Sequence, residues 1–327
     1  MYKFRSIFAE HMENMLAFRV SMGYKETTYI PQLKQLDKFI AEKPNPPTMF
    51  SRELVMEWLN QPGIPSVNAR NSRAGIARLF GDYLHSVGFE AYVLPPKYTA
   101  KQRPAIPYML TATELSGFFH SVDTMRPVSH DCLRTYPASV MLRLIYTCGL
   151  RPGEGLRLKT ENVNLETGEI LITETKLQKE RLIVMHDDMQ KLMSWFTYKR
   201  ELSGRDNTYF FPAPSGQPYP SSWLNRIVKN CYLRIHSDIP PEQIPNIRAY
   251  DLRHRFASAI LCRWLDEGRD LNQMLPYLRT YMGHRTLAQT AYYIHILPEN
   301  LLKSKGIDWD RLNEVIPDTE VFEEWED

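Results

Sequence analysis

The sequence predicts a mainly α-helical protein with a small antiparallel β-sheet, divided into two domains. Apolar residues recur at helical spacing through most of the chain, whereas strand-like runs occur only between residues 162 and 185. The helical period breaks at residues 91–107, AYVLPPKYTAKQRPAIP, which contain four prolines. A length of 327 residues is enough for a hydrophobic core on each side of that break.

The first part of the chain, residues 1–90, is expected to be a small helical domain. Apolar positions predict four helices in it, over residues 4–21, 27–41, 51–59 and 66–87. The last of these helices carries Arg70 and Arg73 on one face. Such arginines are usually part of a solvated surface, but in a DNA-binding protein they contact phosphates or grooves. The choice between these two interpretations depends on the motifs of the second domain.

Residues 91–107 are expected to form an extended linker between the domains. Its Lys97, Lys101 and Arg103 would suit a strap that lies along a DNA phosphate backbone. Beyond it we expect an α+β domain over residues 108–300 and a C-terminal segment over residues 301–327.

The second domain is expected to contain mostly helices, with one short group of strands after the first two. Two helices come first, at residues 113–121 and 136–148. Three antiparallel strands are expected next, at residues 162–168, 170–173 and 181–185. The remaining helices are predicted over residues 187–202, 221–235, 252–265 and 271–282, followed by one that contains Tyr293.

Composition excludes several classes of protein. The chain has no run of eighteen apolar residues and no apolar segment of the secretory kind at its start, so we expect a cytoplasmic protein without a membrane span. Its four cysteines form no CxxC pair and have no histidine at metal-ligand spacing, so neither disulfides nor zinc are expected.

Charge is unevenly distributed along the chain. Residues 299–327 hold ten acidic and three basic residues, which leaves residues 1–298 with 37 basic against 28 acidic, a net charge of +9. A basic body with an acidic tail is compatible with binding a polyanion and with a tail that docks on a basic surface. Solubilising surface charge explains the same composition equally well.

Four motifs carry chemistry. Gly-Leu-Arg with a following glutamate places Arg151 and Glu154 at the end of an apolar helix. The turn TETKLQKERL lies between two strand-like runs, YDLRH begins a helix, and TYMGHRTLAQTAYYIHI ends the domain. In this last stretch a Gly-His turn precedes an exposed tyrosine by about nine residues, which a hydrophobic core does not require.

In this order the motifs resemble the catalytic domain of the tyrosine recombinase (phage integrase) family. The resemblance covers residues 111–297, and the helical first domain agrees with the family's core-binding (SAM-like) domain in size and type. It implies two catalytic arginines with a carboxylate that orients one of them, a lysine, a histidine and a tyrosine nucleophile, here Arg151, Arg253, Glu154, Lys176, His284 and Tyr293. Lys179 and Tyr292 are the competitors for the lysine and tyrosine roles.

One position departs from the family. Tyr250 stands where the first histidine of the pattern His-x-x-Arg normally stands. A phenol can hydrogen-bond a phosphate oxygen but is a poor base near neutral pH, so we expect less dependence on base catalysis there, with activity retained. His254, the residue after Arg253, is expected to point elsewhere on the helix and to be packed or hydrogen-bonded.

The resemblance implies a reaction that needs no metal, ATP or other cofactor. Two arginines and His284 would donate to the phosphate oxygens on which charge accumulates during attack. The tyrosine would form a covalent 3′-phosphotyrosine, and Lys176 would protonate the leaving 5′-oxygen. The retained bond energy would then allow religation to another strand.

The implied partner is double-stranded DNA with inverted-repeat core sites, bound by a homo-tetramer on two duplexes, which would place the protein at the nucleoid. An accessory DNA-bending protein fits this scheme, and the C-terminal segment would dock on a neighbouring subunit. Site-specific recombination, integration and transposition all fit the motifs. One alternative is a type IB topoisomerase, against which the helical first domain and the tail count; another is a regulator derived from a recombinase, which only Tyr250 supports.

Overall fold

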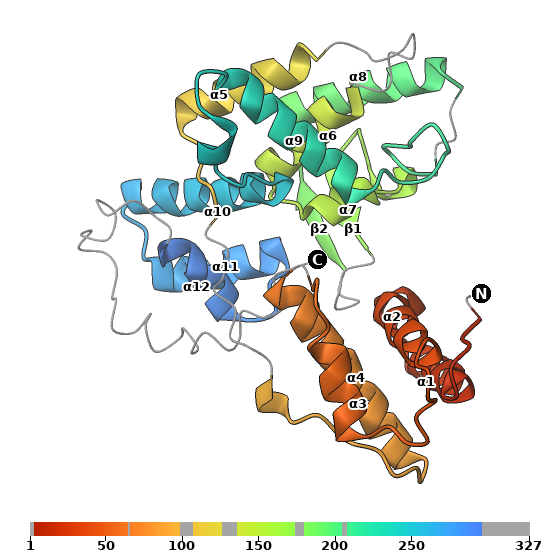
Figure 1. The fold of residues 1–327 in the computed structure, drawn as a ribbon. Helices are drawn as coiled ribbons and strands as arrows, with labels where there is room; N and C mark the ends of the chain where they lie inside the picture. The colour runs from red at the N-terminus through yellow and green to blue at the C-terminus, as the bar shows by residue number, and fades with distance from the viewer. Residues whose placement is uncertain are drawn as a thin grey trace. The chain divides into compact units, whose positions relative to one another are not determined.

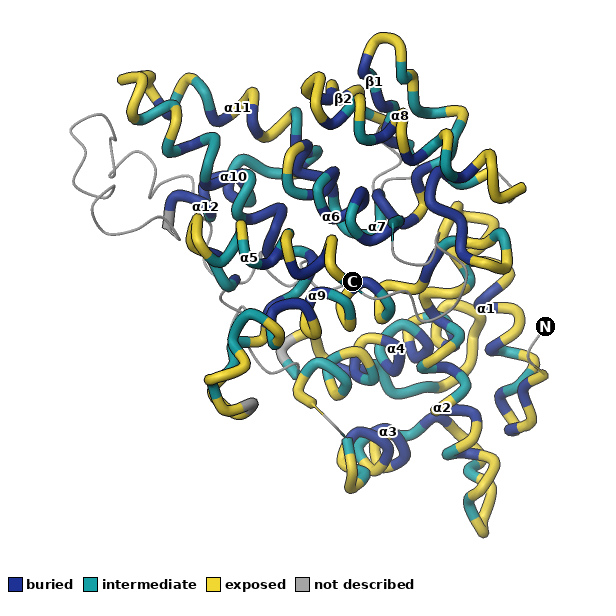
Figure 2. Tube along the Cα trace, turned by 90° about the horizontal axis from the view of Figure 1, so that it is seen from above, coloured by how far each residue is buried: buried dark blue, intermediate teal, exposed yellow. Residues whose placement is uncertain are grey.

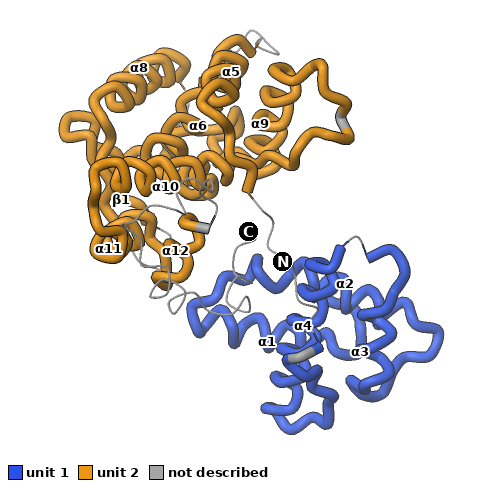
Figure 3. The backbone as a smooth tube through the Cα atoms, turned by 90° about the vertical axis from the view of Figure 1, so that its left-hand side faces the viewer, with its two compact units in different colours: residues 1–104 blue, residues 105–327 orange. Residues whose placement is uncertain are grey.

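The computed structural model describes residues 3–64, 66–98, 107–125, 136–173, 180–204 and 208–295, and at residues 97, 241 and 295 it describes the backbone alone. The chain divides into two compact units, residues 1–104 and 105–327 (Figure 3). In the described ranges no helix is both long enough and apolar enough to cross a membrane. Each unit has its own hydrophobic core.

The first unit contains the four helices that the apolar period predicted. They are α1 (Ala9–Ser21), α2 (Ile30–Ala41), α3 (Arg52–Leu59) and α4 (Val67–Ser86), shown at the red end of the colour range in Figure 1. Ser51 and Ser66 cap α3 and α4, because each side chain accepts a backbone N–H of the first turn. α1 starts five residues later than predicted, since the buried carboxylate of Asp37 binds the backbone N–H groups of residues 5 and 6.

Residues 91–98, the first half of the expected linker, pack on α4. The Tyr92 N–H donates to the Phe50 carbonyl at 2.7 Å, and Leu94 is fully buried. Arg78 on α4 donates to the carbonyl oxygens of residues 94, 95 and 96. The approach is so close that a Cβ added to Gly81 would overlap the Tyr92 carbonyl. This segment therefore belongs to the packing of the first unit.

The second unit is mainly helical and carries one small sheet (Figure 1). In chain order its elements are α5 (Ala112–Asp123), α6 (Tyr136–Cys148), α7 (Pro152–Leu156), β1 (Glu169–Ile172), β2 (Arg181–Val184), α8 (Asp187–Leu202), α9 (Ser221–Ile235), α10 (Ala249–Asp266), α11 (Leu271–Met282) and α12 (Leu287–His295).

Among the described residues the sheet has two strands, so the predicted third strand over residues 162–168 is wrong. β1 and β2 pair antiparallel, with Ile172 opposite Arg181. The predicted strand touches β1 at a single bridge, from Val163. The Asn164 side chain accepts the backbone N–H groups of residues 166 and 167, in the turn that follows. An Asx turn of this kind replaces the ladder hydrogen bonds of a strand.

Two clusters of buried residues fill the second unit. The larger surrounds α6, most of whose residues are buried and which packs against α5, α8 and α10 (Figure 2). The smaller joins α10, α11 and α12 and includes Leu261, Leu275 and Tyr293. α10 contributes to both clusters, so it connects the tyrosine helix to the rest of the unit.

Candidate active site

The corner between α6 and α7 places Arg151. Gly149 follows the end of α6 with a left-handed φ of 62°, and a Cβ added there would overlap the ring of Phe256. Pro152 then begins α7 at the first helical position, where a missing N–H costs nothing. The sequence Gly-Leu-Arg-Pro therefore holds Arg151 at a tight corner.

Glu154 lies among three guanidinium groups, with its side chain 6% exposed. Its Oε1 accepts from Arg151 Nη1 at 2.9 Å and from Arg181 Nη1 at 2.8 Å, and its Oε2 accepts from Arg181 Nη2 at 2.6 Å. Arg253 Nη1 lies 4.0 Å from Oε2. Burial alone raises the pKa of Glu154, but the bonds and charge of Arg181 and the charges of Arg253 and Arg151 lower it to about 2. The carboxylate is therefore ionised at neutral pH.

Arg181 is a residue of this cluster that our sequence interpretation missed. It begins β2, its side chain is 8% exposed, and its Nε donates to the Tyr281 carbonyl at 2.9 Å. The alternating pattern of the strand could have identified Arg181 as a buried residue. Strand alternation puts residue 181 on the same face as the buried Ile183, and an arginine on the inner face of a strand requires a partner.

Arg253 is fully buried in the first turns of α10. Its Nη1 donates to the Gly149 carbonyl and its Nη2 to the Met282 carbonyl, both at 2.7 Å. Nη2 also lies 3.0 Å from His284 Nε2. Its Nε has no hydrogen-bond partner among the described residues. Arg253 thus joins the α6–α7 corner to the end of α11 and retains one N–H for another acceptor.

His284 follows the left-handed Gly283 (φ 65°) that ends α11. Its Nδ1 lies 2.9 Å from Thr290 Oγ1, and Nε2 faces Arg253. Because a guanidinium can only donate, Nε2 is the acceptor and the ring proton sits on Nδ1. Burial first, and then the surrounding arginines, hold the pKa of His284 well below its usual range, so the ring is neutral.

Three successive carbonyl groups at the end of α11 each accept from a different arginine. The acceptors belong to Tyr281, Met282 and Gly283. Their donors are Arg181, Arg253 and Arg151, respectively, at 2.9, 2.7 and 2.8 Å. The carbonyl end of a helix carries partial negative charge, which favours these cations.

Tyr293 lies on the face of α12 that meets this cluster. Its side chain is fully buried, contrary to the exposed position that we expected, because it packs on the rings of His284 and His254, with centroids 5.7 and 5.3 Å away. Its hydroxyl has no hydrogen-bond partner within the described part of the chain. Burial raises the pKa of Tyr293 well above its usual value, although Arg253 and Arg151 act against that shift. Tyr292 is only partly buried.

Tyr250 and His254 lie one turn apart on α10, with ring centroids 4.9 Å apart. His254 is 4% exposed and does pack, as expected, but it packs against Tyr293 and Tyr250 instead of pointing elsewhere. Burial and the charges of Arg253 and Arg248 lower the pKa of His254 to about 3. It is therefore a neutral ring beside the tyrosine.

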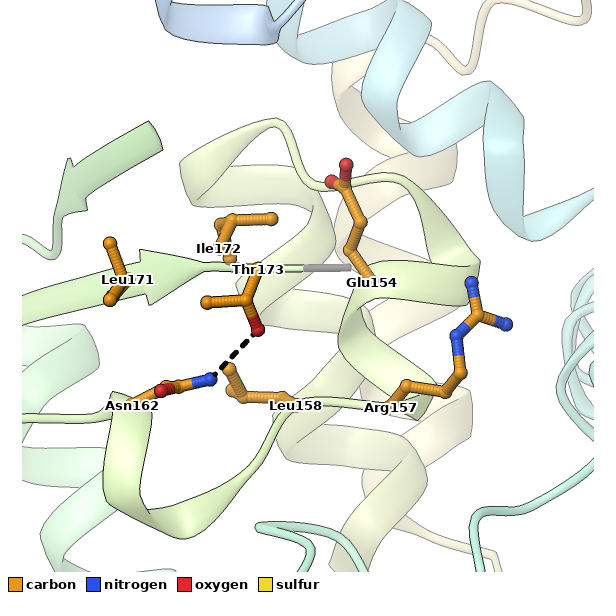
Figure 4. Close-up of a pocket in the computed structure, with 7 residues that line it drawn as sticks. All are labelled: Glu154, Arg157, Leu158, Asn162, Leu171, Ile172 and Thr173. Atoms are coloured by element: carbon orange, nitrogen blue, oxygen red, sulfur yellow. Dashed lines mark hydrogen bonds between the residues drawn. The ribbon is translucent and has the colours of Figure 1, made fainter. Parts of the chain in front are cut away.

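A small polar pocket lies beside Glu154, between α7 and β1 (Figure 4). Asn162 and Thr173 are joined by a hydrogen bond of 3.1 Å on one side of it, and Glu154 and Arg157 line the other. No group of three histidine, cysteine or acidic residues among those described could hold a metal ion. The site is built from cations, one carboxylate and neutral rings.

The other candidates belong to the first unit or fall outside the described residues. Lys176, Lys101 and Arg103 fall outside them, as does the side chain of Lys97. The strands on either side of Lys176 are paired at Ile172 and Arg181.

The two arginines of α4 differ. Arg70 is exposed and donates to Asn60 and Tyr98. Arg73 is partly buried over the Trp58 ring and donates to Gln35, Gln61 and the Trp58 carbonyl. Most of the donors of Arg73 are therefore used within the first unit.

Comparison with known proteins identifies the family. The model of the phage integrase family matches residues 109–300. The putative integrase/recombinase y4rE of Sinorhizobium fredii is 26% identical over 300 residues, 90% of this chain and 93% of the relative. The tyrosine recombinase XerD of Vibrio cholerae is 26% identical over 254 residues, 75% of each chain. The XerH recombinase bound to its palindromic difH substrate shares the fold, with a TM-score of 0.60 and 19% identity over 87% of this chain and 80% of that one. The chain therefore belongs to the phage integrase family and is a site-specific recombinase of the tyrosine class.

Proposed function

We propose that this recombinase cuts and rejoins DNA through a covalent 3′-phosphotyrosine on Tyr293. The observation that carries the proposal is the convergence on one buried cluster of Arg151, Arg253, His284 and Tyr293 from α6–α7, α10, α11 and α12. Tyr293, and not Tyr292, lies against His284. This favours Tyr293 as the nucleophile.

The charge of the cluster suits a phosphodiester. Three guanidinium groups around one carboxylate leave two positive charges uncompensated. A phosphodiester brings one negative charge, and attack by an oxygen nucleophile concentrates a second on the phosphoryl oxygens. The Nε–H of Arg253 and the remaining N–H groups of Arg151 would donate to these oxygens. A dianion bound there would be matched in charge.

The step breaks the bond from phosphorus to the 5′-oxygen and forms a bond from phosphorus to the Tyr293 oxygen. The phenol proton must leave, and the 5′-oxygen must gain one. We assign the second proton to Lys176, as the family resemblance implies. Because the pKa of Tyr293 is raised, we assign its phenol proton to a non-bridging oxygen of the bound phosphate during attack, while the charge of Arg253 stabilises the developing phenolate.

His284 and Tyr250 have secondary roles in this proposal. His284 accepts from Arg253 and so orients that guanidinium; only its other tautomer would donate to the phosphate. Tyr250 lies one turn before His254, on the side of α10 that faces Tyr293, and would hydrogen-bond the phosphate or the nucleophile. Neither residue is required to act as a base at neutral pH.

The partner of the enzyme is double-stranded DNA. XerH was solved on a palindromic site, which supports inverted-repeat core sites for this chain. We propose a homo-tetramer on two duplexes, with residues 301–327 docking on a neighbouring subunit. Arg70, Lys97, Lys101 and Arg103 would contact the phosphate backbone outside the cleavage site.

A suicide substrate tests the proposal. A duplex nicked near the cleavage position, carrying the ends of the DNA element that encodes the protein, traps the covalent complex on a denaturing gel. We expect a band with the wild type and with Tyr292→Phe, and none with Tyr293→Phe. A band that is lost only in Tyr292→Phe would transfer the role to Tyr292. DNA binding without any band would favour a DNA-binding regulator instead.

A further inference from the structure

We propose that Arg181 is a positioning residue of the cleavage site: it fixes Glu154, and through it Arg151, and it holds the end of α11 that presents His284. The inference rests on the proposed function. It adds a residue that touches neither the DNA nor the nucleophile in that proposal.

The contacts of Arg181 use its whole guanidinium fork. Both terminal nitrogens bind the two oxygens of Glu154, and Nε binds the Tyr281 carbonyl on the other edge. Gly283 packs against the same group, because a Cβ added to Gly283 would lie 3.1 Å from Nη1. With its side chain 8% exposed and these donors engaged, Arg181 is directed at protein groups.

Two routes lead from Arg181 to the reacting groups. The first runs through Glu154 Oε1, which accepts from Arg181 and Arg151 at 2.8 and 2.9 Å. Without Arg181, this carboxylate would keep only Arg151 as a close partner, through its Nη1 and its backbone N–H, and would lose both bonds that tie it to β2. The second runs through the Tyr281 carbonyl, two residues before the left-handed Gly283 that sets the direction of His284.

Only an arginine can make this set of contacts. A lysine ammonium is a point charge that can pair with Glu154, but it lacks the planar fork that reaches two carboxylate oxygens and a carbonyl together. Arg181→Lys therefore keeps the charge and removes the geometry. Misplacement of catalytic groups by about 1 Å costs on the order of 100-fold in rate.

The matched control is Arg143→Lys. Arg143 also grips a carboxylate with both terminal nitrogens, at 2.8 and 2.6 Å from Asp123, and it also binds a neighbouring group, Ser139. It lies in the same unit but on the partly exposed side of α6. Comparing the two variants thus separates the general effect of losing a bidentate arginine from the specific effect of losing Arg181 in the site.

The experiment measures DNA affinity, thermal unfolding and single-turnover formation of the covalent complex for the wild type and both variants. We expect Arg181→Lys to bind DNA within about threefold of the wild type and to cleave about 100-fold more slowly. Arg143→Lys should cleave at the wild-type rate. An Arg181→Lys enzyme with wild-type cleavage, or with affinity and cleavage reduced in parallel, would overturn the inference.

Two modified substrates identify what Arg181 acts through. A methylphosphonate at the scissile position removes the charge that the arginines stabilise, so the ratio of wild-type to Arg181→Lys rates should fall towards one. A 5′-bridging phosphorothiolate supplies a leaving group that needs no proton, so there the ratio should remain large. The reverse pattern would show that Arg181 serves the leaving-group side, and would refute the inference.

Folding and function are kept apart by two further comparisons. Arg181→Gln, shorter and uncharged, is measured in parallel in case the lysine variant does not fold; if neither variant folds, Arg181 is a residue of the fold and the inference is wrong. A wild type that forms no Tyr293-dependent complex would instead refute the proposed function.

Discussion

Replacing Glu154 by glutamine tests the electrostatic account of the site. The pKa of this carboxyl falls from 4.5 to about 2 on folding, and one pKa unit is worth about 1.4 kcal/mol, so the ionised group stabilises the fold by roughly 3 kcal/mol. Because the folded-state pKa is the lower one, this contribution is complete above pH 4.5 and is lost as the pH falls towards 2. Glutamine would also leave three arginines without their counter-charge.

We expect Glu154→Gln to lower the free energy of unfolding by about 3 kcal/mol or more at pH 7. For a unit of this size the midpoint temperature should fall by about 6–12 °C. Urea unfolding at pH 7 and pH 3.5 is the assay, and the gap between wild type and variant should shrink by about 1 kcal/mol at the lower pH.

The control for this prediction is Glu161→Gln. Glu161 pairs with Lys159 at 3.3 Å but is 71% exposed, and a surface pair of this kind is worth about 0–1 kcal/mol. Its loss should leave the unfolding energy nearly unchanged at both pH values. A Glu154→Gln gap below about 1 kcal/mol at pH 7, or one that does not change with pH, would refute the reasoning.

Three other predictions follow from the structure. Gly283→Ala should cost at least about 1–2 kcal/mol of stability and slow DNA cleavage, because its Cβ would also crowd Arg181. Gly204→Ala, at φ 64° with nothing within 4 Å, should cost only about 1–2 kcal/mol and leave cleavage unchanged. Arg70→Gln should lower DNA affinity and reduce its salt slope by about 1 without lowering the melting temperature. Arg73→Gln should lower the melting temperature and leave DNA affinity and its salt slope unchanged. Equal effects of the two variants would contradict the assignment of Arg70 to DNA and of Arg73 to the fold. Tyr250→His adds a group that titrates near neutral pH, so the cleavage rate should gain a pH dependence between about pH 5 and 7, and an unchanged profile would argue against a role for this position.

Much of the fold could be predicted from the sequence because its helices are amphipathic. α6, α8, α9 and α11 begin and end at the residues that the apolar period indicated. α7 was missed because its five residues are too few to show a period. The false third strand arose from a run that has strand-like residues but a side chain, Asn164, that closes a turn locally.

The site residues within the motifs could be identified from the order of the motifs along the chain. The contacts that surround those residues could not be predicted in this way. Arg181 reaches a carbonyl 100 residues away, and Arg151 reaches one 132 residues away. Contacts between residues so far apart produce no periodic pattern in the local sequence. For the same reason the burial of Tyr293 and the tautomer of His284 became apparent only in three dimensions.

The hydrogen bonds from three arginines to the end of α11 also constrain the length of the chain there. Successive carbonyl groups of a helix are rotated by about 100° from one another, so each of the three points towards a donor in a different direction. One residue inserted into the last turn of α11 would rotate every acceptor away from its donor and displace His284. At Gly268, between α10 and α11, no heavy atom lies within 4 Å of an added Cβ. The spacing between the last turn of α11 and His284 is therefore fixed by the three arginines.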